Sequence, residues 1–185
     1  MQKNNPSHGV KWGIIIGIVY CILLFIRYKT GATNPLMFSF WIFLGFLTSM
    51  ILLFITGTSY RKLVGGFIEL KDAFRVMFIA VLIFELFYAV FNYIYLKYID
   101  PHFYERFKNA TEAYLQNAKA TQDQIDKTIG SIDVDAPQKM NLFDLLKSYL
   151  FFVAISGAFA FLFALIIKRK GTPFQRDQDN LFQAQ

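Results

Sequence analysis

The sequence contains few of the side chains from which enzymes build active sites. Its 185 residues include one cysteine, Cys21, and two histidines, His8 and His102. One cysteine excludes an intramolecular disulfide and a cysteine metal cluster. The sequence also lacks a zinc-ligand spacing, a serine nucleophile elbow, a Cys–His pair and a nucleotide-binding glycine loop. We therefore expect no catalytic residue, no metal and no cofactor.

Charged residues are sparse and lie mostly between four long apolar runs. Hydrophobic residues make up 55% of the chain and aromatic residues 18%, and the mean hydropathy is +0.38. Soluble domains are about 45–50% apolar, and a helix needs about 20 apolar residues to cross a bilayer. Each run meets that length. We predict an all-α integral membrane four-helix bundle over residues 1–170, with spans at about residues 10–28, 35–56, 73–97 and 142–167.

The distribution of Lys and Arg predicts how the spans are oriented. Ten of these residues fall in the N-terminal segment, the second loop and the tail, whereas the short first loop carries only Arg27 and Lys29. Between Lys97 and Lys139, around the long third loop, seven acidic residues outnumber six basic ones. Because cytoplasmic segments accumulate Lys and Arg, we expect both termini in the cytoplasm and the third loop outside. The polar residues 171–185 are expected to form a disordered cytoplasmic tail.

The net charge of +6 raises the question of nucleic-acid binding. Nucleic-acid-binding domains concentrate basic residues in a stripe or patch. Here the basic residues form no stripe interleaved with exposed aromatic residues, and their placement follows the expected topology. We expect the lipid bilayer, and not a nucleic acid, as the partner of this surface.

The third loop, residues 99–140, has helical signals of its own. Asp100 followed by Pro101 is typical of an N-cap and first helical position. Aromatic residues then recur on one helix face, at Phe103, Phe107 and Tyr114. This stripe either rests on the bilayer or on the protein's own helices, or it is a docking face for a partner.

Further capping signals divide the rest of the third loop. Thr121 and Gln124 have the spacing of a capping box, which predicts the start of a second short helix. Gly130 is a plausible end for that helix. Asn141 then caps the fourth span. The sequence therefore predicts an extramembrane segment with helices of its own.

Glu85 lies near the middle of the third apolar run. An acidic residue at the centre of a membrane helix costs about 2.5–3.5 kcal/mol on insertion scales, so Glu85 is expected to face protein. At about 100° per residue, Tyr88 and Asn92 lie on the same helix face. Judged by depth, the residues on other spans that can donate a hydrogen bond to Glu85 are Tyr20, Thr48 and Ser156.

Three roles are open for Glu85. It can be a buried carboxyl group that holds helices together. It can be part of a proton or cation relay, because ionisable residues inside membranes often mark such paths. It can also contact another subunit.

Small residues at four-residue spacing predict where helix backbones approach one another. They occur on the first, second and fourth spans, at Gly13, Gly17, Gly45, Ala160 and Ala164. Packing within one four-helix bundle is the simplest role for them. Assembly into a homodimer or a larger membrane complex is the alternative.

Two short segments carry a resemblance to a known family. The stretch Gly65-Gly66-Phe-Ile-Glu-Leu-Lys-Asp-Ala-Phe-Arg75, reached from Tyr60-Arg61, and the later Tyr98-Ile-Asp-Pro-His-Phe103 resemble the bacterial membrane family labelled domain of unknown function 4199. The family is found chiefly in Bacteroidota, so the resemblance implies a bacterial inner membrane. It implies no activity, cofactor or catalytic residue.

Gly65 and Gly66 precede the third span. Adjacent glycines permit positive φ without a Cβ clash, which predicts an elbow that sets the angle of that span. Ile68 and Leu70 are then expected in a short entry helix. A phosphate-binding glycine loop is the alternative, but the further glycines and the Lys-Ser/Thr end of a nucleotide loop are missing.

These features favour a non-enzymatic accessory or scaffold subunit of a membrane complex. The alternative is a small proton-linked transporter or channel that uses Glu85. No inverted repeat is evident in the sequence, which weakens the transporter hypothesis. A membrane enzyme ranks third, because the polar residues do not cluster at one membrane interface.

Overall fold

The computed structural model describes residues 6–169, and its regular elements are helices. Four are long: α1 (Pro6–Gly31), α2 (Pro35–Leu63), α3 (Leu70–Ile94) and α7 (Leu142–Ile167). Helix α3 continues into a π-helical turn, η1 (Tyr95–Ile99). Three shorter helices connect η1 to α7, namely α4 (Phe103–Asn117), α5 (Gln122–Gly130) and α6 (Ala136–Lys139).

The four long helices have the length and composition of membrane spans. The apolar helical segments are Ser7–Gly31, Pro35–Leu63, Leu70–Ile99 and Leu142–Ile167. The four expected spans are therefore confirmed, and three of them extend a few residues beyond the predicted bounds. We accordingly treat the chain as a membrane protein. The predicted tail, residues 171–185, lies outside the described residues.

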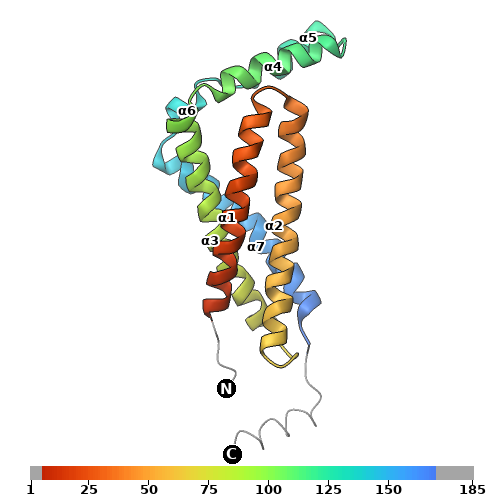
Figure 1. Ribbon diagram of the computed structural model, residues 1–185, viewed down its shortest axis with the longest axis vertical. Coiled ribbons are helices and arrows are strands. Elements are labelled where there is room, and N and C mark those ends of the chain that lie inside the picture. The colour runs from red at the N-terminus through yellow and green to blue at the C-terminus, as the bar shows by residue number, and fades with distance from the viewer. Residues whose placement is uncertain (1–5, 170–185) are drawn as a thin grey trace, which may run out of the picture.

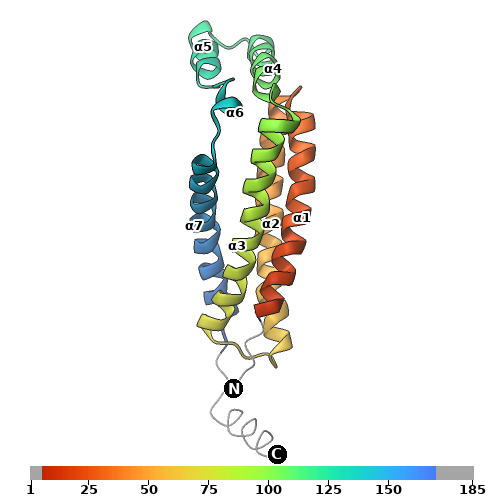
Figure 2. The same ribbon diagram turned by 90° about the vertical axis from the view of Figure 1, so that its left-hand side faces the viewer.

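The long helices stand side by side, and the short helices α4 and α5 form an arm at one end of the bundle (Figure 1). The view from the side shows α7 beside the lower part of α3 and apart from it near the arm (Figure 2). The start of α1 and the end of α7 lie at the opposite end of the bundle from the arm (Figure 1). Four spans therefore return the described chain to the side on which it starts.

Helices α1 and α3 run in the same direction and approach closely because α1 has glycines on the contacting face. A Cβ atom on Gly13 would lie 2.8 Å from Ile83 Cβ and 3.0 Å from the Ala80 carbonyl oxygen. A Cβ on Gly17 would lie 2.7 Å from Phe87 Cγ. The shortest distance at each glycine is too short for a real Cβ atom. The predicted packing residues Gly13 and Gly17 thus lie at the contact between α1 and α3.

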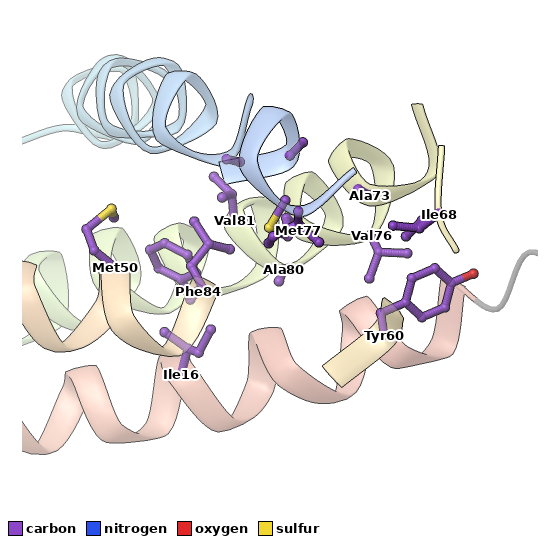
Figure 3. Close-up of a cluster of buried hydrophobic side chains, with 14 of the residues drawn as sticks. Ile16, Met50, Tyr60, Ile68, Ala73, Val76, Met77, Ala80, Val81 and Phe84 are labelled. Atoms are coloured by element: carbon purple, nitrogen blue, oxygen red, sulfur yellow. The ribbon is translucent and has the colours of Figure 1, made fainter. Parts of the chain in front are cut away.

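The other small residues that were singled out also lie at helix contacts. Gly45 of α2 faces the Tyr20 ring, where a Cβ would lie 2.9 Å from Cε2. Ala160 and Ala164 of α7 are fully buried in the main hydrophobic cluster. Figure 3 shows how Ile16 points from α1 toward Phe84 of α3 in the same cluster. These small residues pack inside the bundle of a single chain.

The connection from α2 to α3 has the positive φ angles that its glycines predict. Gly65 has φ +85° and Gly66 has φ +89°. The predicted entry helix at Ile68 is wrong, because Ile68 is extended and α3 begins at Leu70. Ile68 instead exchanges two backbone hydrogen bonds with Arg169, of 3.1 and 3.0 Å. This bridge ties the end of α7 to the start of α3, a pairing that a local sequence pattern does not reveal.

The arm begins two residues later than its sequence signals predict. The Asp100 N–H donates to the Tyr95 carbonyl at 2.7 Å and closes the π-helical turn, and the Asp100 carboxylate pairs with Arg106. His102 takes the N-cap position of α4 instead. Asp100 therefore ends the third span and is not the cap of the next helix.

The other capping predictions for this region are confirmed. Thr121 caps α5, and its N–H donates to Gln124 Oε1 at 3.1 Å. Helix α5 ends at Gly130. The Asn141 side chain accepts a hydrogen bond of 3.0 Å from the Asp144 N–H at the start of α7.

The contact between α1 and α3 predicts an unusual effect of adding one methyl group. In an open helix position Gly→Ala stabilises by about 1 kcal/mol. Gly13→Ala should instead lower the free energy of unfolding by about 1–3 kcal/mol, because the methyl group meets the Ala80 backbone. Thermal unfolding in detergent, followed by circular dichroism, measures the change.

Gly130→Ala provides the matched control. A Cβ at Gly130 meets nothing within 4 Å, and its φ is not positive. This variant should be as stable as the wild type or more stable. A Gly13→Ala protein at least as stable as Gly130→Ala would contradict the close approach of α1 and α3.

Candidate polar site inside the bundle

The most buried carboxyl group of the spans belongs to Glu85, which is 3% exposed on α3. Ser156 of α7 donates its hydroxyl hydrogen to Glu85 Oε1 across 2.5 Å. The second carboxyl oxygen, Oε2, is buried and has no hydrogen-bond partner among residues 6–169. A buried polar atom without a partner costs about 1–3 kcal/mol. Within the described residues, one carboxyl oxygen of Glu85 therefore has a hydrogen-bond partner and the other has none.

Small residues let α7 bring Ser156 to the carboxyl group. Ser156 and its neighbour Gly157 are both buried against α3. A Cβ on Gly157 would lie 3.1 Å from the Phe78 ring, so a larger residue there would crowd that ring. The hydroxyl reaches Glu85 because this turn of α7 is narrow. The structure thus brings together the predicted pair Glu85 and Ser156.

Two tyrosines lie next to this pair. The rings of Tyr20 on α1 and Tyr88 on α3 stack with centroids 5.3 Å apart and an interplanar angle of 18°. Phe84 and Phe152 meet these rings edge-on, at 6.4 and 4.9 Å. Tyr20 makes no hydrogen bond to Glu85 among the described residues, so the predicted donation from its hydroxyl is not seen. The aromatic stack instead packs α1 on α3 about one helical turn from Glu85.

Thr48, the third predicted partner, does not bind Glu85 in the described part of the chain. It lines a narrow crevice between α1 and α2, together with Tyr20 and Gly45. The neighbouring Ser49 is more deeply buried, and its hydroxyl donates to the Phe46 carbonyl at 2.8 Å. Depth along the span was a sufficient guide for Ser156. For Thr48 the rotation of α2 decides, and it places the residue at the crevice between α1 and α2.

Asn92 belongs to a second polar group nearer the arm. Its Oδ1 accepts a hydrogen bond from the Tyr28 hydroxyl, and Tyr28 in turn accepts one of 3.0 Å from Arg27 Nη2. Arg27, Tyr28 and Asn92 thus form a chain of hydrogen bonds from α1 to α3. The predicted stripe of Glu85, Tyr88 and Asn92 is therefore divided between two sites.

Arg27 is the functional candidate that sequence analysis missed. Its charge was counted with the first loop, although the predicted span of residues 10–28 includes it, and it lies within α1 and is 8% exposed. Its guanidinium carbon sits 4.8 Å from the Tyr28 ring centroid and 4.9 Å from that of Phe38, distances at which a cation is attracted by an aromatic face. Its Nε is buried without a partner among residues 6–169.

One signal in the sequence could have found Arg27. It follows Tyr20 by seven residues, which is close to two helical turns. A helix that continued past Ile26 would therefore place Arg27 on the face of Tyr20, toward the bundle. The guanidinium does interact electrostatically with Tyr20 and Tyr88. It connects the polar group near the arm with the one around Glu85.

Aromatic residues surround Arg27 at the end of the bundle that carries the arm. Tyr28 stacks on Tyr95 at 4.6 Å and meets Phe103 edge-on at 4.9 Å. Tyr104 of α4 is partly buried there, and burial raises the pKa of its phenol although Arg27 opposes this shift. Tyr104 therefore stays neutral at physiological pH, and Arg27 is the charged group of this cluster.

The predicted interaction face on the arm is divided by the structure. Phe103 is 0% exposed, and Phe107 packs on Phe38 with ring centroids 4.8 Å apart. These two side chains attach the arm to the bundle and are covered. Tyr114, at 39% exposure, is the member of the stripe that remains open.

The described residues contain no group of three or more His, Cys, Asp or Glu that could hold a metal ion. His8 is buried at the end of the bundle away from the arm, with Nε2 3.2 Å from Ser59 Oγ. His102 stands at the start of the arm, 3.3 Å from Glu105. The two histidines are therefore too far apart to share a ligand.

Comparison with known proteins identifies the family. A family model described as Protein of unknown function (DUF4199) matches residues 11–169. The chain belongs to this family. No curated protein and no solved structure matches it. The DUF4199 match runs from the first turns of α1 to the end of α7, so it includes the polar site and the arm. The resemblance predicted from the two short segments is thus confirmed.

Proposed function

We propose that this DUF4199 protein is a non-enzymatic accessory subunit of a membrane complex, and that the α4–α5 arm presents the surface that a partner subunit binds. The observation that carries this proposal is the way the arm is mounted. Its base is fixed in the bundle, whereas the rest stands clear of the four long helices (Figure 1). A fixed base and an exposed outer face suit a protein–protein contact better than they suit catalysis.

The base of the arm is fixed by aromatic packing. Phe103 lies between Tyr28 and Phe38, and Phe107 continues the contact along α4. Beyond this base, Ile125 of α5 is buried while most of the arm surface is exposed. An interface that excludes water needs an accessible aromatic anchor, and Tyr is enriched among such anchors. Tyr114 supplies one.

The charge distribution supports an orientation with both termini in the cytoplasm and with the arm outside. The bacterial inner membrane is what the family resemblance implies. Labelling of single cysteines in a Cys21→Ser background tests it. With a membrane-impermeant maleimide, Ser131→Cys in the arm should react in intact cells, and Lys62→Cys near the elbow should react only after lysis. The reverse labelling pattern would show that the topology is inverted.

The role of the arm is tested by purifying the tagged protein from its own membranes in a mild detergent and weighing it by native mass spectrometry. Wild-type protein should carry a second membrane subunit. Tyr114→Ser should lose it, because the exposed aromatic anchor is removed. Gln116→Ser, on the opposite side of α4 at about 200°, should retain it. A wild-type protein that is always a lone monomer would overturn the proposal.

A second candidate function is proton-linked transport through Glu85. The buried Oε2 has no hydrogen-bond partner among residues 6–169, which favours this function, since a relay needs an oxygen that can take and release a proton. Arg27 and the stacked Tyr20 and Tyr88 extend the polar region from Glu85 toward the arm. The interior thus holds a carboxyl group and a cation that are not bonded directly to each other.

If Glu85 relays protons, Glu85→Gln should abolish proton conductance of proteoliposomes, because an amide cannot exchange a proton at this position. Glu105→Gln, an exposed carboxylate on α4, should leave the conductance unchanged. Thermal unfolding of each variant checks the fold. Equal conductance of wild type and a folded Glu85→Gln protein would leave Glu85 with a packing role alone.

A further inference from the structure

An open groove runs along the outer side of the contact between α1 and α3. Its volume is about 330 Å³, and it is lined by Ile18, Cys21, Ile22, Phe25, Phe87 and Phe91. Five of these six residues have hydrocarbon side chains. The Cys21 thiol points toward the Phe87 carbonyl oxygen, 3.9 Å away. The groove therefore presents an apolar wall to the surrounding bilayer.

The groove arises from the same glycine that lets the helices meet. Gly17 admits the Phe87 ring against the α1 backbone, and Cys21, one turn later, is another small residue at this face. On either side stand larger residues, of which Ile18, Ile22 and Phe25 are exposed. A narrow floor between bulky walls is a shape that a flexible hydrocarbon chain fills by dispersion contacts.

A cation stands at one end of the groove. The ammonium group of Lys29 lies 5.7 Å from the ring centroid of Phe25, and Lys29 is exposed. Arg27 is not available to the outside, because it is buried and donates to Tyr28. The last turns of α1 thus direct one cation into the bundle and one to its surface.

The distance along α1 from the inner end of the groove to Lys29 matches one leaflet of a membrane. From Ile18 to Lys29, α1 rises about 16 Å at about 1.5 Å per residue. Half of the hydrocarbon core of a bilayer is about 15 Å. When Lys29 lies at the level of the phosphates, Ile18 therefore lies near the bilayer midplane. The apolar groove and the surface cation are therefore spaced like the acyl chain of a lipid and its head group.

We propose that this groove is a binding site for a phospholipid with an anionic head group, with one acyl chain along Cys21 and the phosphate at Lys29. Anionic lipids are attracted to basic residues near the membrane surface, so the site selects by charge at its mouth and by shape along its wall. This inference is independent of the role of the arm and of Glu85.

Native mass spectrometry of delipidated protein tests the site, with long-chain phosphatidylglycerol and phosphatidylcholine of the same acyl composition as probes. Wild-type protein should bind phosphatidylglycerol more tightly. Lys29→Gln should weaken that binding about fivefold, the factor expected for one basic residue near an anionic lipid, and should leave phosphatidylcholine binding unchanged. Inorganic phosphate should not compete, because it has no chain to fill the groove.

Lys147→Gln is the matched control. Lys147 is an exposed cation at the arm end of α7, with its ammonium group 4.4 Å from the Phe143 ring centroid, but it does not border this groove. This variant should bind phosphatidylglycerol as the wild type does. Equal loss in Lys29→Gln and Lys147→Gln, or no preference between the two lipids in the wild type, would overturn the proposal.

A third variant tests the acyl-chain seat. Ile22 is exposed in the wall of the groove, so Ile22→Trp can fill the groove without disturbing the buried core. It should weaken the binding of both long-chain lipids. Unchanged binding by a folded Ile22→Trp protein would show that the chain does not lie there.

Discussion

The close parallel contact of α1 with α3 is the constraint on which the rest of the structure depends. Glycines at positions 9, 13 and 17 remove the side chains that would hold these backbones apart. The contact stacks the Tyr20 ring on the Tyr88 ring and places the Tyr28 hydroxyl within hydrogen-bond distance of Asn92. On its outer side it leaves the groove that ends at Lys29. One helix pair therefore fixes the geometry of both the polar interior and the lipid-facing surface.

The two buried ionisable groups, Glu85 and Arg27, depend on different helices. Glu85 is bonded to Ser156 of α7, whereas Arg27 is bonded through Tyr28 to Asn92 of α3. In a bilayer, apolar surface gives little preference for one helix rotation over another, because lipid tails are as apolar as the core. Hydrogen bonds between specific side chains supply that preference. The Glu85–Ser156 bond fixes the rotation of α7, and the Tyr28–Asn92 bond fixes that of α1.

The sequence was most informative where a local pattern determines the structure. Hydrophobic length located the spans, paired glycines predicted the elbow, and capping spacings located the starts of α5 and α7. Rotation about a helix axis is not local, so depth alone wrongly grouped Thr48 with Glu85. The end of the apolar run was also a poor guide to the end of α1, because aromatic rings allow a helix to bury Arg27 beyond it. Phe103 and Phe107 were correctly identified as an apolar face, but only the fold shows that the bundle covers them.

The arm and the polar interior share residues, and this links the two candidate functions. Phe38 contacts the Arg27 guanidinium and also the rings of Phe103 and Phe107 at the base of the arm. Tyr28 does the same, since it accepts a hydrogen bond from Arg27 and packs against Phe103. A partner that shifted the arm would therefore move the aromatic rings that shield Arg27 from water. Because a buried charge is sensitive to its solvation, a contact at the arm would act on the environment of Arg27, the cation of the polar interior.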